Sequence, residues 1–322
     1  MSSSSHSSAV MITGATGGLG QSLARRLARH RDFDSVVLAV RNAERGTALR
    51  DSLQAQFPMV RFAVSQMDLA SLASVRAAAA QVEEPLDAIV LNAGGTGGAQ
   101  PRARTQDGVS QMFAANIVGH AALVDLLLSS GLLRGTVEFV GSEAAFGVPA
   151  LRLPAPAIAD GSVAEFSSWI DGSWFDSRKY DRGLAHGQTK LLGALWIGAL
   201  ARSRPELRTV AMSPGNTSGT GVLRDLPLPL RALIPRVNAL LGRSHSLEFG
   251  TERLTLGVLD PAYGTGRFWA SAPGEITGPV VDQAVAHPLI EDPTLQDHAN
   301  LALRAFFDRP ESCSLTRTGR LS

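Results

Sequence analysis

The residues whose type and spacing point most plainly to a chemical role are three glycines near the start of the chain. Segment 13–20 has the sequence TGATGGLG, and it lies between an apolar run at 9–13 and a helical pattern that begins near Leu19. Glycines allow a tight turn whose backbone approaches a pyrophosphate, and the phosphate charge then lies at the positive end of the helix. Ordinary strand-to-helix turns also contain glycine, but this placement favours binding of a dinucleotide by Gly14, Gly18 and Gly20.

The choice between two nicotinamide nucleotides depends on the end of the second apolar run. In dinucleotide folds an acidic residue about 20 positions after the turn holds the ribose 2′-hydroxyl of NAD. The residues there are Val40, Arg41 and Asn42, with no carboxylate. A guanidinium binds a 2′-phosphate in a fork, so Arg41 predicts NADP(H) in preference to NAD(H). A solvated surface arginine is the alternative, because 28 of the 30 basic residues are arginines.

Two later turns add residues that could face the same nucleotide. Asp68 follows the third apolar run, where its carboxylate could meet an adenine edge or cap the next helix. Asn92, Ala93 and Gly94 follow the fourth run, and a turn of such small residues can lie against a cofactor.

The elements that must position these turns alternate along the chain. Apolar periodicity predicts strands at 9–13, 35–40, 60–65, 87–91 and 136–141, and helices at about 19–28, 43–56 and 73–82. Apolar strands separated by helices of this length indicate right-handed crossovers and a parallel sheet covered on both faces. We therefore expect an α/β protein with a doubly wound, Rossmann-like sheet of about seven strands.

One domain is expected at residues 9–310, between a disordered tail at 1–8 and a second tail at 311–322. Residues 146–183 and 213–244 are rich in proline or glycine and lack a sustained period. Long irregular connections of this kind are usually binding loops, and both follow strands at the edge where open α/β sheets bind ligands. They are predicted to form an irregular lid on the substrate side.

Composition excludes several classes of function. The formal net charge is +1, so the protein lacks the strong positive electrostatic field that would hold nucleic acid or an anionic membrane surface. No apolar run is long enough for a membrane-spanning helix, and the serine-rich start is no secretory signal. The single cysteine, Cys313, can form neither an internal disulfide nor a thiolate metal site. A cytoplasmic protein with no metal is expected.

Several motifs in order resemble the short-chain dehydrogenase/reductase family. They are TGxxxGxG at Thr13, DL at Asp68, NAG at Asn92, Asn116 in NIVGH, Ser142 after the fifth strand, and PG at Pro214. The match runs from about residue 10 to residue 269. VRN at Val40, LASLASVR at 69–76 and YDRGLAHGQTK at 180–190 resemble the NADP-dependent branch of retinol dehydrogenases and protochlorophyllide reductases.

The resemblance implies a cofactor site, a catalytic group and a homodimer or homotetramer. The implied cofactor residues are Thr13, Gly14, Thr16, Gly18, Leu19, Gly20, Arg41, Asp68, Leu69, Asn92, Ala93, Gly94, Lys190, Pro214, Gly215 and Thr217. The implied catalytic group is Asn116, Ser142 and a tyrosine and lysine spaced YxxxK, but the sequence here is HGQTK, with His186 in the place of the tyrosine and Lys190 retained.

His186 and Lys190 are four residues apart and therefore share one helix face. A cation this close disfavours imidazolium, so we expect the pKa of His186 to lie below its ordinary value and the ring to be neutral near pH 7. Neutral imidazole accepts a proton well and donates one poorly. The alternative is a decayed site in which His186 is only a spacer.

Five other residues could have roles in the site. Tyr180 is a possible substitute for the missing phenol, ranked below His186, and Glu143 is a possible proton carrier, although a solvated loop carboxylate is the preferred explanation. His120 is expected to be packed and hydrogen-bonded. Trp169 and Trp174 either form the floor of a substrate pocket or anchor the long loop.

Three functions remain open from the sequence. The leading one is an NADP(H)-dependent oxidoreductase that acts on a carbonyl or alcohol of a moderately apolar small molecule. The second is a non-redox dehydratase, isomerase or cyclase that uses His186 as a general base. The third is a catalytically inactive protein that binds NADP(H).

Overall fold

Eight strands form the centre of the protein in the computed structural model, which describes residues 7–218 and 244–308. The strands are β1 (Ala9–Thr13), β2 (Ser35–Val40), β3 (Arg61–Gln66), β4 (Leu86–Leu91), β5 (Leu133–Val140), β6 (Arg208–Met212), β7 (Arg267–Ser271) and β8 (Val280–Asp282). The helices are α1 (Gly18–His30), α2 (Ala43–Gln56), α3 (Leu72–Ala79), α4 (Gln111–Phe113), α5 (Gly119–Ser129), α6 (Val163–Asp171), α7 (Arg182–Ser203), α9 (Leu247–Leu259) and α10 (Pro293–Phe307).

All eight strands join one sheet in the order β3-β2-β1-β4-β5-β6-β7-β8. Every neighbouring pair is parallel except β7 and β8. The direction of the strand order reverses between β1 and β4, and ligands of open α/β sheets bind in the crevice at such a reversal. The doubly wound sheet is confirmed, with eight strands in place of the expected seven because the short edge strand β8 folds back onto β7.

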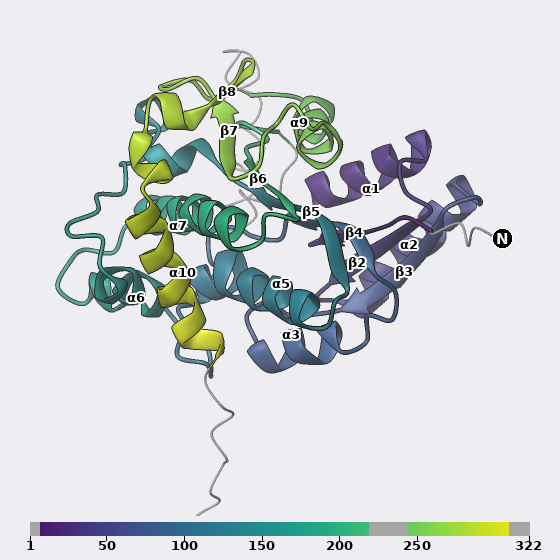
Figure 1. The fold of residues 1–322 in the computed structure, drawn as a ribbon, viewed down its shortest axis with the longest axis horizontal. Coiled ribbons are helices and arrows are strands. Elements are labelled where there is room, and N and C mark those ends of the chain that lie inside the picture. Colours follow the sequence, from purple (N-terminus) through teal and green to yellow (C-terminus); the bar gives the residue numbers. More distant parts are fainter. Residues whose placement is uncertain (1–6, 219–243, 309–322) are drawn as a thin grey trace, which may run out of the picture.

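Helices cover both faces of this sheet (Figure 1). Alternate residues of β1 explain why: Val10 and Ile12 join a core beneath α1, α2 and α9, whereas Met11 joins a core beneath α3, α5 and α7. Because successive side chains in a strand point to opposite faces, an unbroken apolar strand needs a cover on each side. Helices α6 and α10 pack on α7 as a further layer.

The long connection after β5 is more regular than the sequence predicts. Helix α6 lies within it, and short 3₁₀ turns occupy Glu143–Phe146, Pro149–Leu151 and Ser173–Phe175. Ser162 caps the start of α6 by accepting from Glu165 N at 3.1 Å. The Glu165 carboxylate in turn accepts the backbone N–H groups of Ala159, Asp160 and Gly161. The prediction of an irregular 146–183 segment is therefore wrong over α6.

The predicted tails and second loop are only partly described. Ser8 is anchored, because its backbone N–H and hydroxyl both donate to the Asp34 carboxylate, so the expected tail at 1–8 is wrong at this residue. Residues 1–6, most of the predicted 213–244 loop, and the predicted tail at 311–322 lie outside the described residues.

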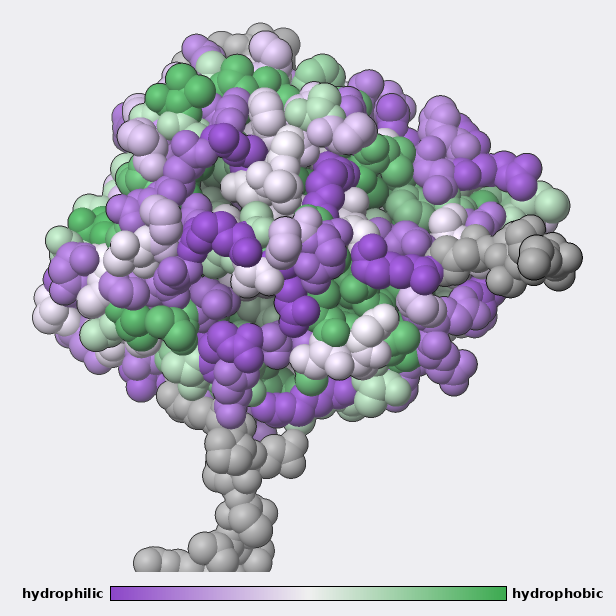
Figure 2. Space-filling model, viewed as in Figure 1, coloured by the Kyte–Doolittle hydropathy of each residue, from purple (hydrophilic) through white to green (hydrophobic). Residues whose placement is uncertain are grey.

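The expectation that no apolar run is long enough for a membrane-spanning helix is wrong for one helical run, Gln111–Ser129, which has that length and composition. In this run 72% of the most apolar window is buried inside the protein, as in a core helix. On the face shown in Figure 2, hydrophilic residues predominate and hydrophobic ones form small separate groups.

Glu138, within β5, is an ionisable residue in an unusual setting. Its side chain is fully buried, and neither carboxylate oxygen has a hydrogen-bond partner among the described residues. Burial raises the pKa of Glu138 well above its ordinary value of 4.5, and the nearby Arg208 only partly opposes this. The folded protein therefore holds this carboxyl group in its neutral form to higher pH than the unfolded chain does.

We predict that Glu138→Gln abolishes a pH-dependent loss of stability. Above pH 4.5 the unfolded chain releases the Glu138 proton while the folded protein keeps it, so the free energy of unfolding falls by about 1.4 kcal/mol per pH unit until the folded-state pKa is reached. The neutral amide has no such proton. Urea unfolding from pH 5 to pH 8 should show the variant gaining on the wild type as pH rises.

The matched control is Glu252→Gln, which neutralises an exposed carboxylate on α9. A constant difference in unfolding free energy between Glu138→Gln and the wild type at every pH would contradict the assignment.

Candidate functional site

The turn between β1 and α1 has the shape that a phosphate-binding loop requires. Gly14 adopts a left-handed φ of +63°, and a Cβ on it would lie 2.8 Å from the Ala93 Cα. A Cβ on Gly20 would lie 2.6 Å from the Gly14 carbonyl oxygen. Only glycine fits at these two positions, and the turn opens directly onto the positive end of α1. Gly18 begins α1, and Thr16 and Leu19 lie partly buried beside it. This cradle fits a pyrophosphate.

The turn after β4 is fixed against the glycine turn by two hydrogen bonds. Asn92 Nδ2 donates to the Thr13 carbonyl at 2.8 Å, and Ala93 N donates to Thr13 Oγ1 at 3.0 Å. Since β1 and β4 flank the reversal of strand order, these bonds join the two walls of the ligand crevice. Asn92 and Ala93 thus lie beside the glycine turn, and contact of the 92–94 turn with a cofactor stays a prediction.

His120 links the glycine turn to Asn116 from inside the protein. It is fully buried, with Nε2 at 3.0 Å from Thr13 Oγ1 and Nδ1 at 3.3 Å from the Asn116 carbonyl oxygen. Burial, more than the nearby Lys190, lowers the pKa of His120 to about 3. The expectation of a packed, hydrogen-bonded histidine is confirmed.

Asn116 lies in a π-helical turn, Ala114–Val118, between α4 and α5. Its Oδ1 accepts from Gly95 N at 3.0 Å, and its Nδ2 donates to the carbonyl oxygens of Gly95 and Met112 at 2.9 and 2.7 Å. The side-chain amide is thus committed to backbone groups. Its effect on the site is to hold the segment that follows Gly94.

Helix α7 brings His186 and Lys190 to the crevice. Asp181 caps the helix by accepting from Leu184 N at 2.8 Å, and residues four apart then share a face. The Lys190 ammonium is buried, donates to the Val140 carbonyl at 2.8 Å and lies 4.9 Å from the centre of the Phe139 ring. Burial lowers the pKa of Lys190 to about 8. A Cβ on Gly94 would be 3.8 Å from this ammonium, so Lys190 reaches the turn after β4.

His186 is neutral at physiological pH, as the sequence predicts, but for a different leading reason. Its pKa is lowered to about 3 chiefly by burial and secondarily by the Lys190 charge, against a raising contribution from the Gly95 backbone. Sequence reasoning named only the lysine. In the part of the chain that the structure describes, the buried Nδ1 of His186 has no hydrogen-bond partner.

Ser142 follows β5 and faces the start of α7. Its Oγ accepts from Ala144 N at 3.2 Å, which leaves the hydroxyl proton available to another acceptor. A Cβ on Gly187 would be only 2.5 Å from the Ala144 carbonyl oxygen, so the residue next to His186 packs directly on the turn that Ser142 begins.

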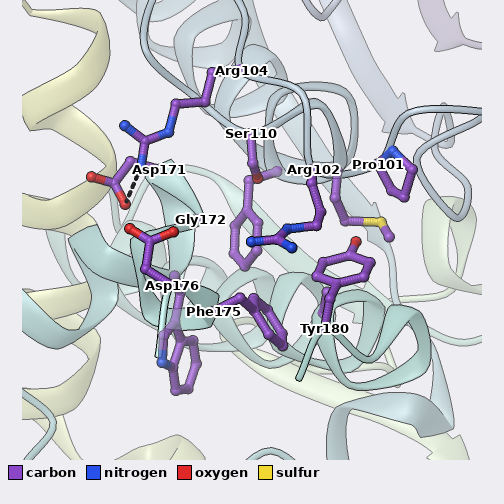
Figure 3. A pocket seen from close by; sticks show the side chains of 13 residues that line it. Pro101, Arg102, Arg104, Ser110, Asp171, Gly172, Phe175, Asp176 and Tyr180 are labelled. Carbon is purple, nitrogen blue, oxygen red and sulfur yellow. Dashed lines mark ion pairs between the residues drawn. The ribbon is translucent and has the colours of Figure 1, made fainter. Parts of the chain in front are cut away.

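Tyr180 faces a small hollow lined by residues of the 101–113 segment, α6 and the 172–185 segment (Figure 3). Its neighbours there include Phe175 at 4.8 Å between ring centres and the Arg102 guanidinium at 5.7 Å from the ring. Burial raises the pKa of Tyr180, and the charges that act on it belong to Arg182, Arg102 and Asp181, not to Lys190. Tyr180 precedes α7, as predicted, and nothing in its surroundings places it in the role of the missing phenol. Trp169 is fully buried and also lines this hollow.

The remaining predicted cofactor residues lie at the same edge of the sheet. Arg41 is exposed directly after β2. Asp68 does not cap α3, because Ser71 does; its Oδ1 instead accepts from Ala70 N at 3.0 Å, and Leu69 is buried in the core. Pro214, Gly215 and Thr217 follow β6, where Thr217 Oγ1 donates to the Pro214 carbonyl at 2.9 Å.

Sequence reasoning misjudged one residue and missed another. Glu143 is not a solvated loop carboxylate: its side chain is only 11% exposed and lies 3.7 Å from the buried guanidinium of Arg253 on α9. The position of Glu143 directly after Ser142 was the available signal. No local pattern marks Arg253, which is 110 residues further along the chain.

Known proteins share features of both the sequence and the fold. The family model for short chain dehydrogenase matches residues 8–153. Over 196 residues the chain is 34% identical to polyprenol dehydrogenase of Mus musculus. The aligned stretch covers 60% of this chain and 53% of that protein. Over 201 residues it is 30% identical to retinol dehydrogenase 13 of Homo sapiens, again 60% of this chain and 53% of that protein. The chain thus spans about half the length of these curated relatives.

A solved structure has a similar fold. It is a short-chain dehydrogenase from Sphingobium yanoikuyae in complex with NADPH, which superimposes with a TM-score of 0.52 at 20% identity and covers 78% of this chain and 83% of that chain.

We predict that His186 stays neutral from pH 5 to pH 8 in the folded protein. Nitrogen-15 NMR of the imidazole, assigned by its absence in His186→Phe, should show no titration in that range, whereas histidines of the urea-unfolded chain titrate near pH 6.5. Because burial is the larger cause, Lys190→Met should raise the pKa of His186 but leave it below 6.5. An imidazolium signal from His186 at pH 6 would contradict both points.

Proposed function

We propose that the chain is a member of the short-chain dehydrogenase/reductase family, in its retinol dehydrogenase-like branch, and that it is an NADP(H)-dependent oxidoreductase. Its substrate is a moderately apolar small molecule with a carbonyl or alcohol carbon. When bound, the nucleotide supplies or takes up the hydride.

The observation that supports this function most directly is the convergence on Gly94. The glycine turn packs on Ala93, the Asn116 side chain holds Gly95, and the Lys190 ammonium lies beside Gly94. A phosphate cradle, a buried cation and a neutral histidine therefore meet in one crevice at the reversal of the sheet. Such an arrangement suits a nucleotide at one end and proton transfer at the other.

Each residue of the crevice has a distinct task in the proposed reaction. Lys190 holds the nicotinamide ribose hydroxyls with its ammonium, and Ser142 donates a hydrogen bond from its hydroxyl to the substrate oxygen. His186 exchanges a proton with that oxygen, and Asn116 fixes the loop that borders it. Because an imidazole is shorter than a phenol, the substrate oxygen must lie deep in the crevice or be reached through a water molecule.

The preference for NADP(H) rests on Arg41. Its guanidinium follows β2 and is exposed, next to the capping residue Asn42. This position can hold a 2′-phosphate in a fork, and no carboxylate is present at positions 40–42 to bind a free 2′-hydroxyl. The Sphingobium yanoikuyae relative in complex with NADPH has the same fold.

A second function is favoured by His186 Nδ1, which has no hydrogen-bond partner among the described residues. A neutral imidazole with a free nitrogen can act as a general base, which suits dehydration, isomerisation or cyclisation without hydride transfer. The two functions differ in whether the nucleotide is consumed, and the experiment on hydride transfer below separates them.

We predict that Arg41→Ala weakens NADPH binding about 10- to 100-fold, the usual effect of losing one charge-assisted contact. NADH has no 2′-phosphate, so its affinity should hardly change. Fluorescence titration of both nucleotides checks this. Arg29→Ala, which removes an exposed arginine from the last turn of α1, is the control. Equal loss for NADPH and NADH would contradict the assignment.

We predict that 4-deuterated NADPH transfers deuterium to the product. A panel of aldehydes and ketones is incubated with each C4-labelled form of the nucleotide, and mass spectrometry follows the label. His186→Phe should lower the turnover rate about 10²- to 10⁴-fold, as for loss of an acid–base group, and should keep NADPH affinity. Substrate conversion with all deuterium retained in the nucleotide would exclude the oxidoreductase and support the non-redox function.

A further inference from the structure

A buried ion pair lies on the opposite side of Ser142 from the glycine turn. Glu143 Oε1 and Arg253 Nη1 are 3.7 Å apart, and their side chains are only 11% and 4% exposed. Neither Glu143 nor Arg253 has a role in the proposed reaction. Burying two charges costs free energy unless further hydrogen bonds satisfy both groups.

Two serines that lie between the charges supply most of those hydrogen bonds, and the Gly278 carbonyl accepts another from Arg253 Nη2, while the buried Arg253 Nε has no partner among the described residues. Ser213, directly after β6, donates its hydroxyl to Glu143 Oε2 at 2.7 Å, and its carbonyl accepts from Arg253 Nη1 at 3.3 Å. Ser271, the last residue of β7, donates its N–H to Glu143 Oε1 at 3.1 Å, and its Oγ accepts from Arg253 Nη2 at 3.1 Å. The pair therefore joins the carboxyl ends of β5, β6 and β7.

A relay of hydrogen bonds connects the pair to the turn after β6. Gly215 N donates to Ser213 Oγ at 3.0 Å, so the single hydroxyl proton of Ser213 is directed to Glu143. The charge at the end of such a chain polarises each bond along it. A Cβ on Gly215 would lie 2.8 Å from Arg253 Nη1, so the turn rests directly against the guanidinium.

We propose that Glu143 and Arg253 are positioning residues that set the 214–217 turn relative to Ser142. Glu143 is joined to Ser142 by a peptide bond, and the turn is held through Ser213, so both sides of the nicotinamide end of the crevice are fixed to one pair of charges. The proposal rests on the proposed function for the identity of the nucleotide. The adenosine end, at Arg41 and the glycine turn, lies outside the reach of the pair.

The test uses two nucleotides that share the adenosine and its 2′-phosphate, of which the second lacks the nicotinamide riboside and one phosphate. NADPH and adenosine 2′,5′-bisphosphate are titrated against the wild type, Glu143→Gln and Arg253→Met. Both variants should bind NADPH about 10- to 100-fold more weakly, because each leaves one buried charge without its partner, and both should bind the bisphosphate as the wild type does. The double variant should lose less than the product of the two single effects.

Hydrogen exchange provides a readout that needs no nucleotide. Glu143→Gln should speed exchange of the Gly215 and Ser271 amides, with no change at amides of β1 and β2. Ser213→Ala cuts the relay without removing a charge and should give a smaller change in the same direction, even where the charge variants fold poorly. Glu165→Gln, which weakens an equally backbone-bonded carboxylate at α6, is the matched control and should leave both nucleotides and both amides unaffected.

Several results would overturn the proposal. Equal loss of affinity for both nucleotides, together with faster exchange throughout the sheet, would reduce the pair to a general stabiliser. Unchanged exchange at Gly215 and Ser271 would show that the turn does not depend on it. If the wild type binds neither nucleotide, the proposed function fails, and the exchange measurement alone decides whether the pair positions the turn.

Discussion

Burial of the Lys190 ammonium is the constraint on which the rest of the site depends. A desolvated cation is stable only where dipoles replace its water, and here the Val140 carbonyl at 2.8 Å and the face of Phe139 at 4.9 Å do so. Both groups belong to β5, the strand that ends just before Ser142. The same contact therefore fixes α7, the helix that carries His186, against the strand that precedes Ser142. It also places a positive charge beneath the turn after β4.

The crevice lies between two buried polar networks with different characters. On one side, Thr13, His120 and Asn116 join the glycine turn to α5 through groups that are neutral at physiological pH. On the other side, a full ion pair joins the ends of β5, β6 and β7. Neutral groups suit the wall that must approach a phosphate without adding charge of their own. Opposite charges suit the wall whose turn must be held in one position.

Local sequence patterns predict much of the sheet. They fail for short or interrupted elements and for contacts between residues that are far apart in the sequence. The bounds of β1, β2 and α2 agree with the sequence because each is a clean apolar or capped segment, as Asn42 at the start of α2 illustrates. Helix α6 was missed although Phe166, Trp169 and Ile170 have helical spacing, because prolines and glycines surround it. Strand β8 has three residues, too few for a period. The partners of Glu143 come from β6, β7 and α9, and no sequence window contains them together.

The substitution of histidine for tyrosine changes how protons can move in this site. A phenol that loses its proton becomes an anion, which the Lys190 ammonium stabilises. An imidazole that gains a proton becomes a cation one helical turn from that ammonium, in a buried setting that already lowers the pKa of His186 to about 3 and that of Lys190 to about 8. Two cations there repel, so the Lys190 charge adds to burial in disfavouring the imidazolium. A proton accepted by His186 from a substrate oxygen must leave quickly, or Lys190 must release its own. Because the pKa of Lys190 is only about one unit above neutral pH, that release costs about 1.4 kcal/mol at pH 7. In the proposed reaction, the lowered pKa of Lys190 eases proton transfer to His186 by letting the neighbouring charge leave, while burial still disfavours the imidazolium.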